Sequence, residues 1–416
     1  MNRRFNIALV SFSTVVVGAL LAGAVMGRGA TSEDPYKHIA VFTEVLQRIK
    51  SDYVEEPDLK GVTMGAVNGL LEAVDPYASY LSADQFKQYQ KQKDQKRADT
   101  GLILSKRFGY IGVVDAIPGS PAAKAGLNTG DMLESIKGVA TRDMPLAYAE
   151  LLLKGDAGSS VDLTVLRTRK PESQKVTLTR ANVKFPAVQS KLLPDQTGHI
   201  ALQTLEPAKV KEVASAIENL EKQGAKRLVL DLRNCAYGAA EDGMPLANLF
   251  LDKGLIGYLQ GQRVTKQTFE AVAAKQVTKL PLVVLTNRGT AAAAEVAAAA
   301  LLDLKRAEVV GERTYGDAAL RKAITLDDGS ALILAVAKYY SPSGISIQDK
   351  AVMPSVPMSD APEPADSDDD TAAPEPAEVK PRTGEDPLLK KAIDVLINGV
   401  PKTTAKVAAG APAPKK

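Results

Sequence analysis

The feature that most constrains the fold is the segment GSPAAKAGLNTGD at residues 119–131. Ser120 is a preferred residue for capping a helix start, and Pro121 suits the first helical position. Gly126 favours the left-handed conformation that ends a helix, and Gly130 with Asp131 favours a turn. The segment therefore predicts a very short helix enclosed by two turns.

Short runs of β-forming residues surround this helix at residues 102–104, 110–114, 161–166 and 176–178. Their order around the short helix resembles a PDZ domain, which would span residues 98–182. PDZ domains add a peptide to their sheet as an extra strand, and a loop of backbone N–H groups holds the peptide's terminal carboxylate. The resemblance implies that the peptide-binding residues are Thr100, Gly101, Leu102 and Ile103.

Residues 183–356 alternate between patterns typical of strands and of helices. Buried-type strands are predicted at 227–232, 279–286, 308–311 and 331–337, and helices at 210–220 and 290–304. Such alternation predicts an α/β core whose functional loops follow the strand ends.

Residues 31–97 are predicted to form helices. Val41, Leu46 and Ile49 share one apolar face, and a second helical pattern ends at Asp75, before a proline. Ser82 is a candidate cap for a third helix. An N-terminal helical region is therefore expected before the PDZ-like segment.

The first 30 residues have the pattern of an export signal. Arg3 and Arg4 precede an apolar run at residues 7–26. The run is either a cleaved signal peptide or a membrane anchor, with the N-terminus in the cytoplasm. We therefore expect an exported protein of the periplasm or cell envelope, held at the membrane if the run is retained.

The C-terminal part divides into three segments. Residues 357–385 are acidic and proline-rich, which predicts a linker. Residues 386–398 have helical spacing, and residues 399–416 have the composition of a disordered tail.

Composition excludes several classes of function. The net charge is +3, from 52 basic and 49 acidic residues, which predicts no nucleic-acid partner. Cys235 is the single cysteine, so no internal disulfide or multi-cysteine metal site can form. His38 and His199 are the two histidines, and each is predicted to be a surface or boundary residue. We predict no metal and no cofactor.

Several ordered motifs resemble the C-terminal processing peptidases, the tail-specific serine peptidases of the cell envelope. DLRN at residues 231–234 is similar to their DLRNNPGG, and GTAAAAE at 289–295 to their GSASASE. VGERTYGD at 310–317 and YYSPSG at 339–344 are similar to VGEKTFGK and YYTPSG. The likeness covers residues 36–356 and implies an α+β and α/β multidomain protein. Its parts would be an N-terminal helical region, a PDZ β-domain and a crotonase-like α/β peptidase core.

The family's catalytic residues are replaced in this chain. The resemblance places Ala292 at the serine nucleophile, Asp317 at the lysine base and Arg321 at the assisting glutamine. Tyr237 and Gly238 fall in the loop that supplies an oxyanion-binding N–H group, and Tyr237 replaces a glycine. In the PDZ loop, too, a glycine and an aliphatic residue of the family are replaced, by Asp99 and Thr100.

Three interpretations follow. The first is a catalytically inactive scaffold that binds C-terminal peptide tails and assembles as a homo-oligomer or with an active relative. The second is an active serine-type endopeptidase with a rearranged site, for which Thr290 and Cys235 are the nearest candidate nucleophiles. The third is an envelope structural protein whose PDZ domain binds nothing.

The spacing of Asp317 and Arg321 predicts an ion pair within one helical turn.

Overall fold

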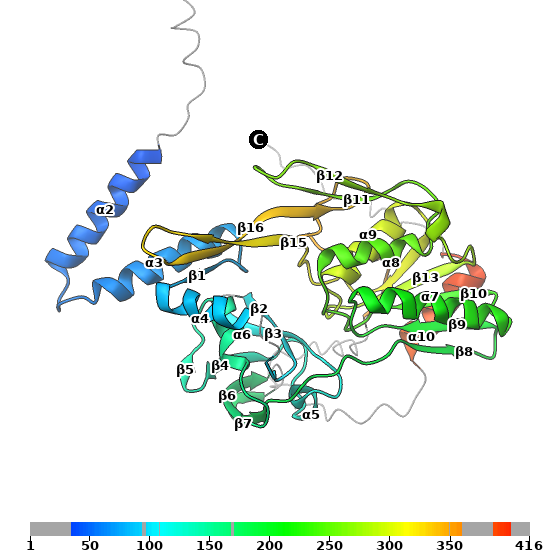
Figure 1. Ribbon diagram of the computed structural model, residues 1–416, viewed down its shortest axis with the longest axis horizontal. Helices are drawn as coiled ribbons and strands as arrows, with labels where there is room; N and C mark the ends of the chain where they lie inside the picture. Colours follow the sequence, from blue (N-terminus) through cyan, green and yellow to red (C-terminus); the bar gives the residue numbers. More distant parts are fainter. Residues whose placement is uncertain are drawn as a thin grey trace, which may run out of the picture. The chain divides into compact units, whose positions relative to one another are not determined.

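The computed structural model describes residues 35–93, 97–107, 109–167, 170–348, 350–359 and 386–400 (Figure 1). The chain divides into two compact units, Met1–Ala66 and Val67–Lys416. The predicted signal or anchor, most of the predicted linker and nearly all of the predicted tail lie outside the described residues. Among the helices that are described, none combines the length and apolarity needed to cross a membrane.

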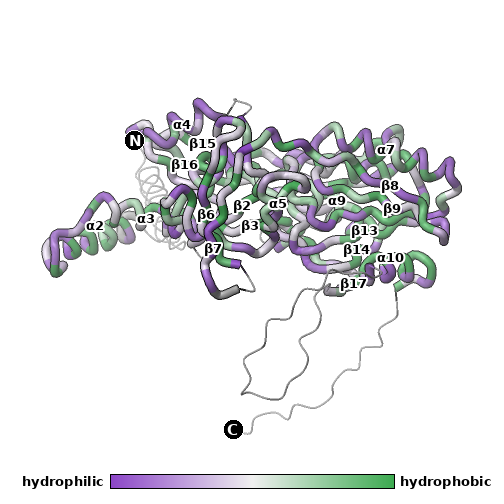
Figure 2. Tube along the Cα trace, turned by 90° about the horizontal axis from the view of Figure 1, so that it is seen from below, coloured by the Kyte–Doolittle hydropathy of each residue, from purple (hydrophilic) through white to green (hydrophobic). Residues whose placement is uncertain are grey.

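The first unit contains α2 (Pro35–Asp52) and the beginning of α3 (Leu59–Val74). α3 ends immediately before Asp75, where the following proline predicted a break. Hydrophobic residues recur along α2 (Figure 2). Several of them are exposed, including Ile39, Val41 and Val45. The helices predicted for this region are therefore present, and α2 carries apolar side chains on its surface.

The segment after α3 contains a strand that the sequence did not predict. α4 (Ala83–Lys93) begins with a reciprocal cap, in which Ser82 and Gln85 each bond the other's backbone N–H. Just before it, β1 (Ser79–Leu81) pairs with β16 (Ala331–Tyr340). Residues 31–97 are thus not entirely helical, because a three-residue strand shows no periodicity and depends on a distant partner.

The PDZ domain is an antiparallel sheet with two helices. Ser120 accepts a hydrogen bond from the Ala123 N–H at the start of the short helix, and Gly126 has a φ of +70°, as the sequence predicted. The core is formed by apolar side chains of the sheet and of the longer helix, including Ile111, Leu133 and Leu153. The strand order is β2 (Leu102–Arg107), β3 (Tyr110–Ala116), β4 (Met132–Ile136), β6 (Ser160–Arg167), β7 (Lys170–Thr179), with β5 (Val139–Ala140) on β4; the helices are α5 (Pro121–Lys124) and α6 (Leu146–Leu153).

The peptidase core is built on a second sheet, which is parallel except at β8. Its order is β17 (Val356–Pro357), β14 (Ala307–Gly311), β13 (Leu282–Thr286), β10 (Arg227–Asp231), β9 (Thr197–Ala201), β8 (Gln189–Leu192). β17 pairs with β14, so the predicted linker starts later than residue 357.

Helices cover both faces of this sheet. Leu228 and Leu230 pack in one cluster with α7 (Pro207–Lys222), α8 (Gly243–Asn248) and α9 (Ala293–Asp303). Val229 points the other way and packs with α10 (Pro387–Asn398). Because successive side chains face opposite sides and both sides are covered, the three central residues of β10, 228–230, are all apolar.

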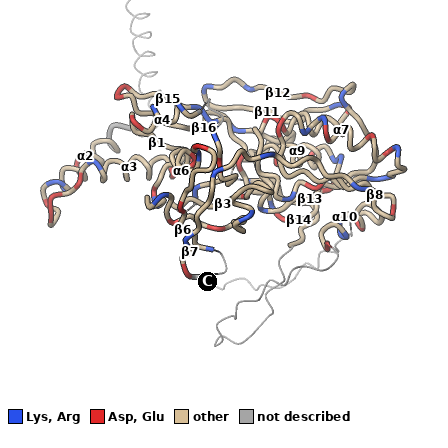
Figure 3. Tube along the Cα trace, turned by 60° about the horizontal axis from the view of Figure 1, so that its bottom comes forward, with Lys and Arg blue, Asp and Glu red and all other residues tan. Residues whose placement is uncertain are grey.

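A third sheet links β1 to segments of the core. It runs in the order β1, β16, β11 (Leu255–Gln260), β12 (Gln267–Glu270), with β15 (Ala319–Thr325) also pairing with β16. Basic and acidic residues are interspersed along the chain (Figure 3). The fold is therefore an α+β and α/β assembly of helices, PDZ domain and α/β core.

Candidate functional site

The predicted site residues come together at the carboxyl ends of three neighbouring parallel strands. The loops after β10, β13 and β14 meet there, as expected for an open parallel sheet. They border a cavity of about 490 Å³. Its lining residues are Glu206, Ala236, Tyr237, Gly238, Ala239, Ala240, Asp242, Ala292, Asp317, Ala319 and Arg321. All five residues that the family resemblance assigned to the reaction centre line this one cavity.

Ala292 sits at a strained turn into α9. Its φ of 51° and ψ of −115° are unusual for a residue with a Cβ atom. Such a conformation costs on the order of 1–3 kcal/mol and persists only where its surroundings impose it. Ala292 is partly exposed, whereas residues 293–300 are all buried. The backbone therefore presents this side chain to the cavity, but the side chain is a methyl group.

Glu295 holds the two key loops together. Its carboxylate accepts hydrogen bonds from the N–H groups of Ala292 (3.1 Å), Gly316 (2.7 Å) and Asp317 (2.8 Å), and from the Thr314 hydroxyl. Burial raises the pKa of Glu295 to about 7. No role was predicted for Glu295 from the sequence, although it is the one charged residue in the alanine-rich start of α9.

Asp317 and Arg321 form an ion pair inside the cavity. Arg321 Nη2 donates to Asp317 Oδ1 at 2.7 Å, and both side chains are about one quarter exposed. The Arg321 guanidinium also lies 4.4 Å from the centre of the Tyr77 ring. Although burial lowers the pKa of Arg321, the charge of Asp317 and their hydrogen bond raise it overall.

The predicted pairing is correct, but the predicted helical turn is wrong. Asp317 lies in a loop and Arg321 lies in β15. The register of β15 against β16 shifts between Leu320 and Arg321. Such irregularities turn a strand and re-aim its side chains. Sequence spacing alone could not show this.

The oxyanion loop retains one glycine for a clear reason. Gly238 has a φ of +138°, and a Cβ atom there would lie 1.9 Å from the Leu205 carbonyl oxygen. The neighbouring Tyr237 places its ring against Phe185, with centroids 4.5 Å apart. Tyr237 is 40% exposed and contributes to the cavity wall. An aromatic ring thus stands where the family has a glycine.

Neither alternative nucleophile reaches the cavity. Thr290 is fully buried, and its hydroxyl donates to the Leu232 carbonyl at 2.8 Å and accepts from the Asn287 N–H. Cys235 is buried as well, and burial raises its thiol pKa well above the usual range. Among the described residues that line the cavity there is no lysine, serine, threonine or cysteine.

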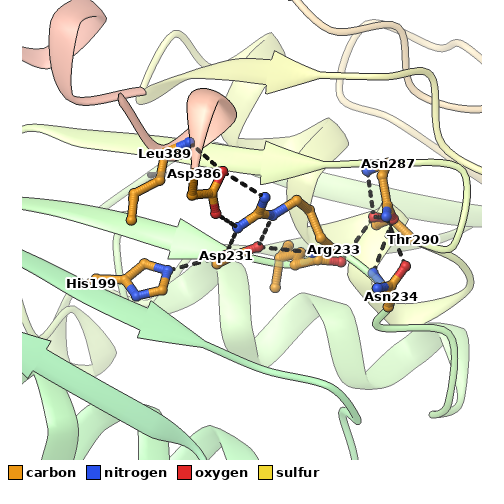
Figure 4. Close-up of polar contacts among 9 residues, drawn as sticks. His199, Asp231, Arg233, Asn234, Asn287, Thr290, Asp386 and Leu389 are labelled. Atoms are coloured by element: carbon orange, nitrogen blue, oxygen red, sulfur yellow. Dashed lines mark hydrogen bonds and ion pairs between the residues drawn. The ribbon is translucent and has the colours of Figure 1, made fainter. Parts of the chain in front are cut away.

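A polar network around Asp231 fixes the loop after β10 (Figure 4). Arg233 bonds Asp231 at 2.6 Å and, through both Nη atoms, Asp386, which caps α10 through the Leu389 N–H. His199 Nε2 lies 3.0 Å from Asp231 Oδ2. His199 therefore serves the scaffold and lies outside the set of cavity-lining residues.

Two asparagines connect the loops after β10 and β13 (Figure 4). Asn287 Nδ2 donates to Asn234 Oδ1 at 2.7 Å, and Asn287 Oδ1 accepts from the Asn234 N–H at 3.0 Å. The same Oδ1 atom accepts from Gly289 N–H. The loops that carry the candidate site are therefore cross-linked by hydrogen bonds.

The predicted peptide-binding residues lie together at the beginning of β2. Thr100 is fully buried, whereas Leu102 and Ile103 are partly exposed. β2 is an edge strand, and β3 is its sheet neighbour. Ile103 packs against a small cluster of Val114, Ala236 and Ala291. This cluster joins the PDZ domain at β2 and β3 to the loops of the cavity.

Comparisons with known proteins agree with this architecture. Residues 196–358 match Peptidase family S41, and residues 112–167 match the PDZ domain. The carboxy-terminal processing protease CtpA of Bacillus subtilis is 31% identical over 364 residues, which are 86% of this chain and 78% of that protein. A carboxyl-terminal-processing protease of Picosynechococcus is 33% identical over 70% of this chain and 71% of its own.

A solved structure of a C-terminal processing protease has a similar fold. The photosystem II D1 C-terminal processing protease superposes with a TM-score of 0.63 and 27% identity. The superposition covers 77% of this chain and 92% of that one.

Proposed function

The chain belongs to the C-terminal processing peptidase family, and from that premise we propose that it is a non-catalytic member that binds polypeptide tails. The observation that carries the proposal is the content of the cavity. A methyl group stands at the nucleophile position, Ala292, and an ion pair of Asp317 with Arg321 fills the positions of the base and its assistant.

This constellation cannot perform the family's chemistry. A serine nucleophile needs a hydroxyl group and a neighbouring base that accepts its proton. Ala292 offers no hydroxyl, and Arg321 stays protonated in proteins. Asp317 Oδ1 already accepts a hydrogen bond from Arg321. Loss of an equivalent nucleophile lowers turnover by about 10⁶-fold in a well-studied serine protease.

Binding would take place at the PDZ domain. Among the described strands β2 pairs with β3 alone, which leaves an edge to which an extended peptide can add as a strand, and Leu102 and Ile103 are partly exposed there. The relatives are proteases that process carboxyl termini, and a PDZ domain suits the capture of such tails. The chain would therefore bind polypeptide tails, as the family does, without cleaving them.

We further propose that the protein is exported and acts in the cell envelope as an oligomer, with itself or with an active relative. The basic residues and apolar run at positions 3–26 support export. The exposed apolar residues of α2 support assembly. Cell fractionation with N-terminal sequencing tests the first part, and sedimentation of the chain with and without residues 35–66 tests the second.

Incubation of the purified full chain with a fluorescein-labelled unfolded protein tests the lack of catalysis. We expect no cleavage above buffer, while the same preparation shows a cooperative unfolding transition. Matched variants are Asp317→Ala, Cys235→Ala and Thr290→Val. Cleavage by the natural chain that any of these variants abolishes would overturn the proposal. Cleavage that persists equally in all three would indicate a contaminating protease.

A further inference from the structure

The loop that leads into β2 is held in one conformation. The Thr100 carbonyl accepts the Ala122 N–H at 2.9 Å, and the Gly101 carbonyl accepts the Ile117 N–H at 2.8 Å. Gly101 has a φ of +81°, and a Cβ atom there would lie 2.2 Å from Ser120 Cβ. The N–H groups of this loop therefore have fixed directions.

Asp99 uses those N–H groups itself. Its Oδ1 atom accepts hydrogen bonds from the N–H groups of Thr100 (2.6 Å) and Gly101 (3.3 Å). The Thr100 hydroxyl donates to the same atom at 3.3 Å. One carboxylate oxygen of the chain thus collects three donors at the start of the groove, which is where a PDZ loop would hold a ligand carboxylate.

The Asp99 backbone is also anchored. Its N–H donates to the Ala181 carbonyl and its carbonyl accepts the Ala181 N–H, both at 3.0 Å. The side chain therefore starts from a fixed point beside the N–H groups that donate to it. Displacing the carboxylate would require new partners for it and for the two backbone N–H groups.

We infer that Asp99 is a built-in carboxylate that closes the end of the PDZ groove, so that the domain binds internal extended segments and does not select a free C-terminal carboxylate. This inference rests on the proposed tail-binding function and names the part of the tail that is read. An incoming carboxylate would meet donors already in use and a fixed charge of the same sign. A segment lacking that group meets no such penalty and can still pair with the β2 edge.

The test compares two forms of the same peptides. A pool of fluorescent decapeptides, randomised to aliphatic residues at the last four positions, is prepared as free acids and as C-terminal amides. Binding to the full chain is measured by fluorescence anisotropy for the natural protein and for Asp99→Ala. The control is Asp162→Ala, which removes one carboxylate from β6, a strand separated from β2 by β3 and β4.

We expect the natural chain and Asp162→Ala to bind the acid no better than the amide. Asp99→Ala is expected to prefer the acid by about tenfold or more, because the loop N–H groups become available. If the natural chain binds neither form and Asp99→Ala binds the acid, Asp99 closes the loop to a carboxylate, but the binding of internal segments is refuted.

Two results would overturn the inference. One is a tenfold preference of the natural chain for the free acid. The other is an Asp99→Ala protein that is folded and still indifferent to the terminal group. Neither result bears on whether the cavity cleaves peptides, so the proposed lack of catalysis stands or falls separately.

Discussion

The cavity and the PDZ loop have been altered in the same way but with different consequences. Each keeps a glycine that the packing demands, Gly238 in the first and Gly101 in the second. Each also carries a carboxylate that the family pattern lacks, Asp317 and Asp99 respectively. Asp317 is neutralised by a side chain, Arg321, whereas Asp99 is satisfied by backbone N–H groups of its own loop.

The difference lies in what each region retains. In the cavity the backbone frame remains, including the strained Ala292, while the reactive groups are gone. In the PDZ loop the binding groups remain, but the chain itself occupies them. In the function proposed here, the first change removes chemistry, and the second changes what is recognised.

The largest expected effect on stability concerns the backbone of the loop at Gly238. Gly238→Ala should lower the free energy of unfolding by about 4 kcal/mol, since it adds backbone strain and a clash with the Leu205 carbonyl. Urea denaturation followed by circular dichroism measures it. The control is Gly224→Ala, which has a φ of +95° but open space around its Cβ position. Equal losses in both variants would show that close approach does not matter at Gly238.

The next effect is a pH dependence from Glu295. Burial raises the pKa of Glu295 from 4.5 to about 7. As the pH rises, the unfolded chain therefore releases this proton at a lower pH than the folded chain does. Stability should therefore fall as the pH rises from about 4.5 to about 7, by roughly 3 kcal/mol for this group. The free energy of unfolding of the natural chain should therefore fall relative to that of Glu295→Gln as the pH rises over that range. Parallel stability curves for the two proteins would contradict this assignment.

A smaller effect on stability is expected from the ion pair of Asp317 with Arg321. Asp317→Ala and Arg321→Ala should each destabilise the chain by about 2 kcal/mol, because each leaves a partly buried charge without its partner. The double variant should cost about 1–2 kcal/mol less than the sum of the single effects. A double-mutant cycle by thermal or urea unfolding gives this coupling. Additive losses would mean that the pair is not coupled.

The smallest effect is expected at the PDZ loop. Asp99→Ala removes one acceptor from two backbone N–H groups at a partly exposed position, which should cost about 1 kcal/mol. Hydrogen exchange of the Thr100 and Gly101 amides should become faster. Unchanged exchange would show that these donors do not depend on Asp99.

Much of this arrangement follows from local sequence. The Ser120 cap, the Gly126 turn and the alternation of strands and helices identify the PDZ and α/β parts, because each depends on neighbouring residues. The positions of Ala292 and Asp317 in one cavity follow from the family motifs, which lie at the ends of parallel strands.

Other features depend on contacts between distant residues and could not be predicted. β1 exists through its pairing of Ser79 with Ile333. The roles of Glu295 and Asp99 depend on which backbone N–H groups the fold brings to their carboxylates. The spacing of Asp317 and Arg321 indicated an ion pair but the wrong element, since spacing does not distinguish a helical turn from an irregular strand.

The most direct measurement compares cleavage of a labelled unfolded protein by the natural chain and by a variant with Ala292→Ser, Asp317→Lys and Arg321→Gln. If the frame is intact and only the reactive groups are lost, the natural chain is silent and the variant cleaves. If both are silent, adding Tyr237→Gly should give activity, because that ring stands at the oxyanion loop. Cleavage by the natural chain, abolished by Asp317→Ala, would contradict the account.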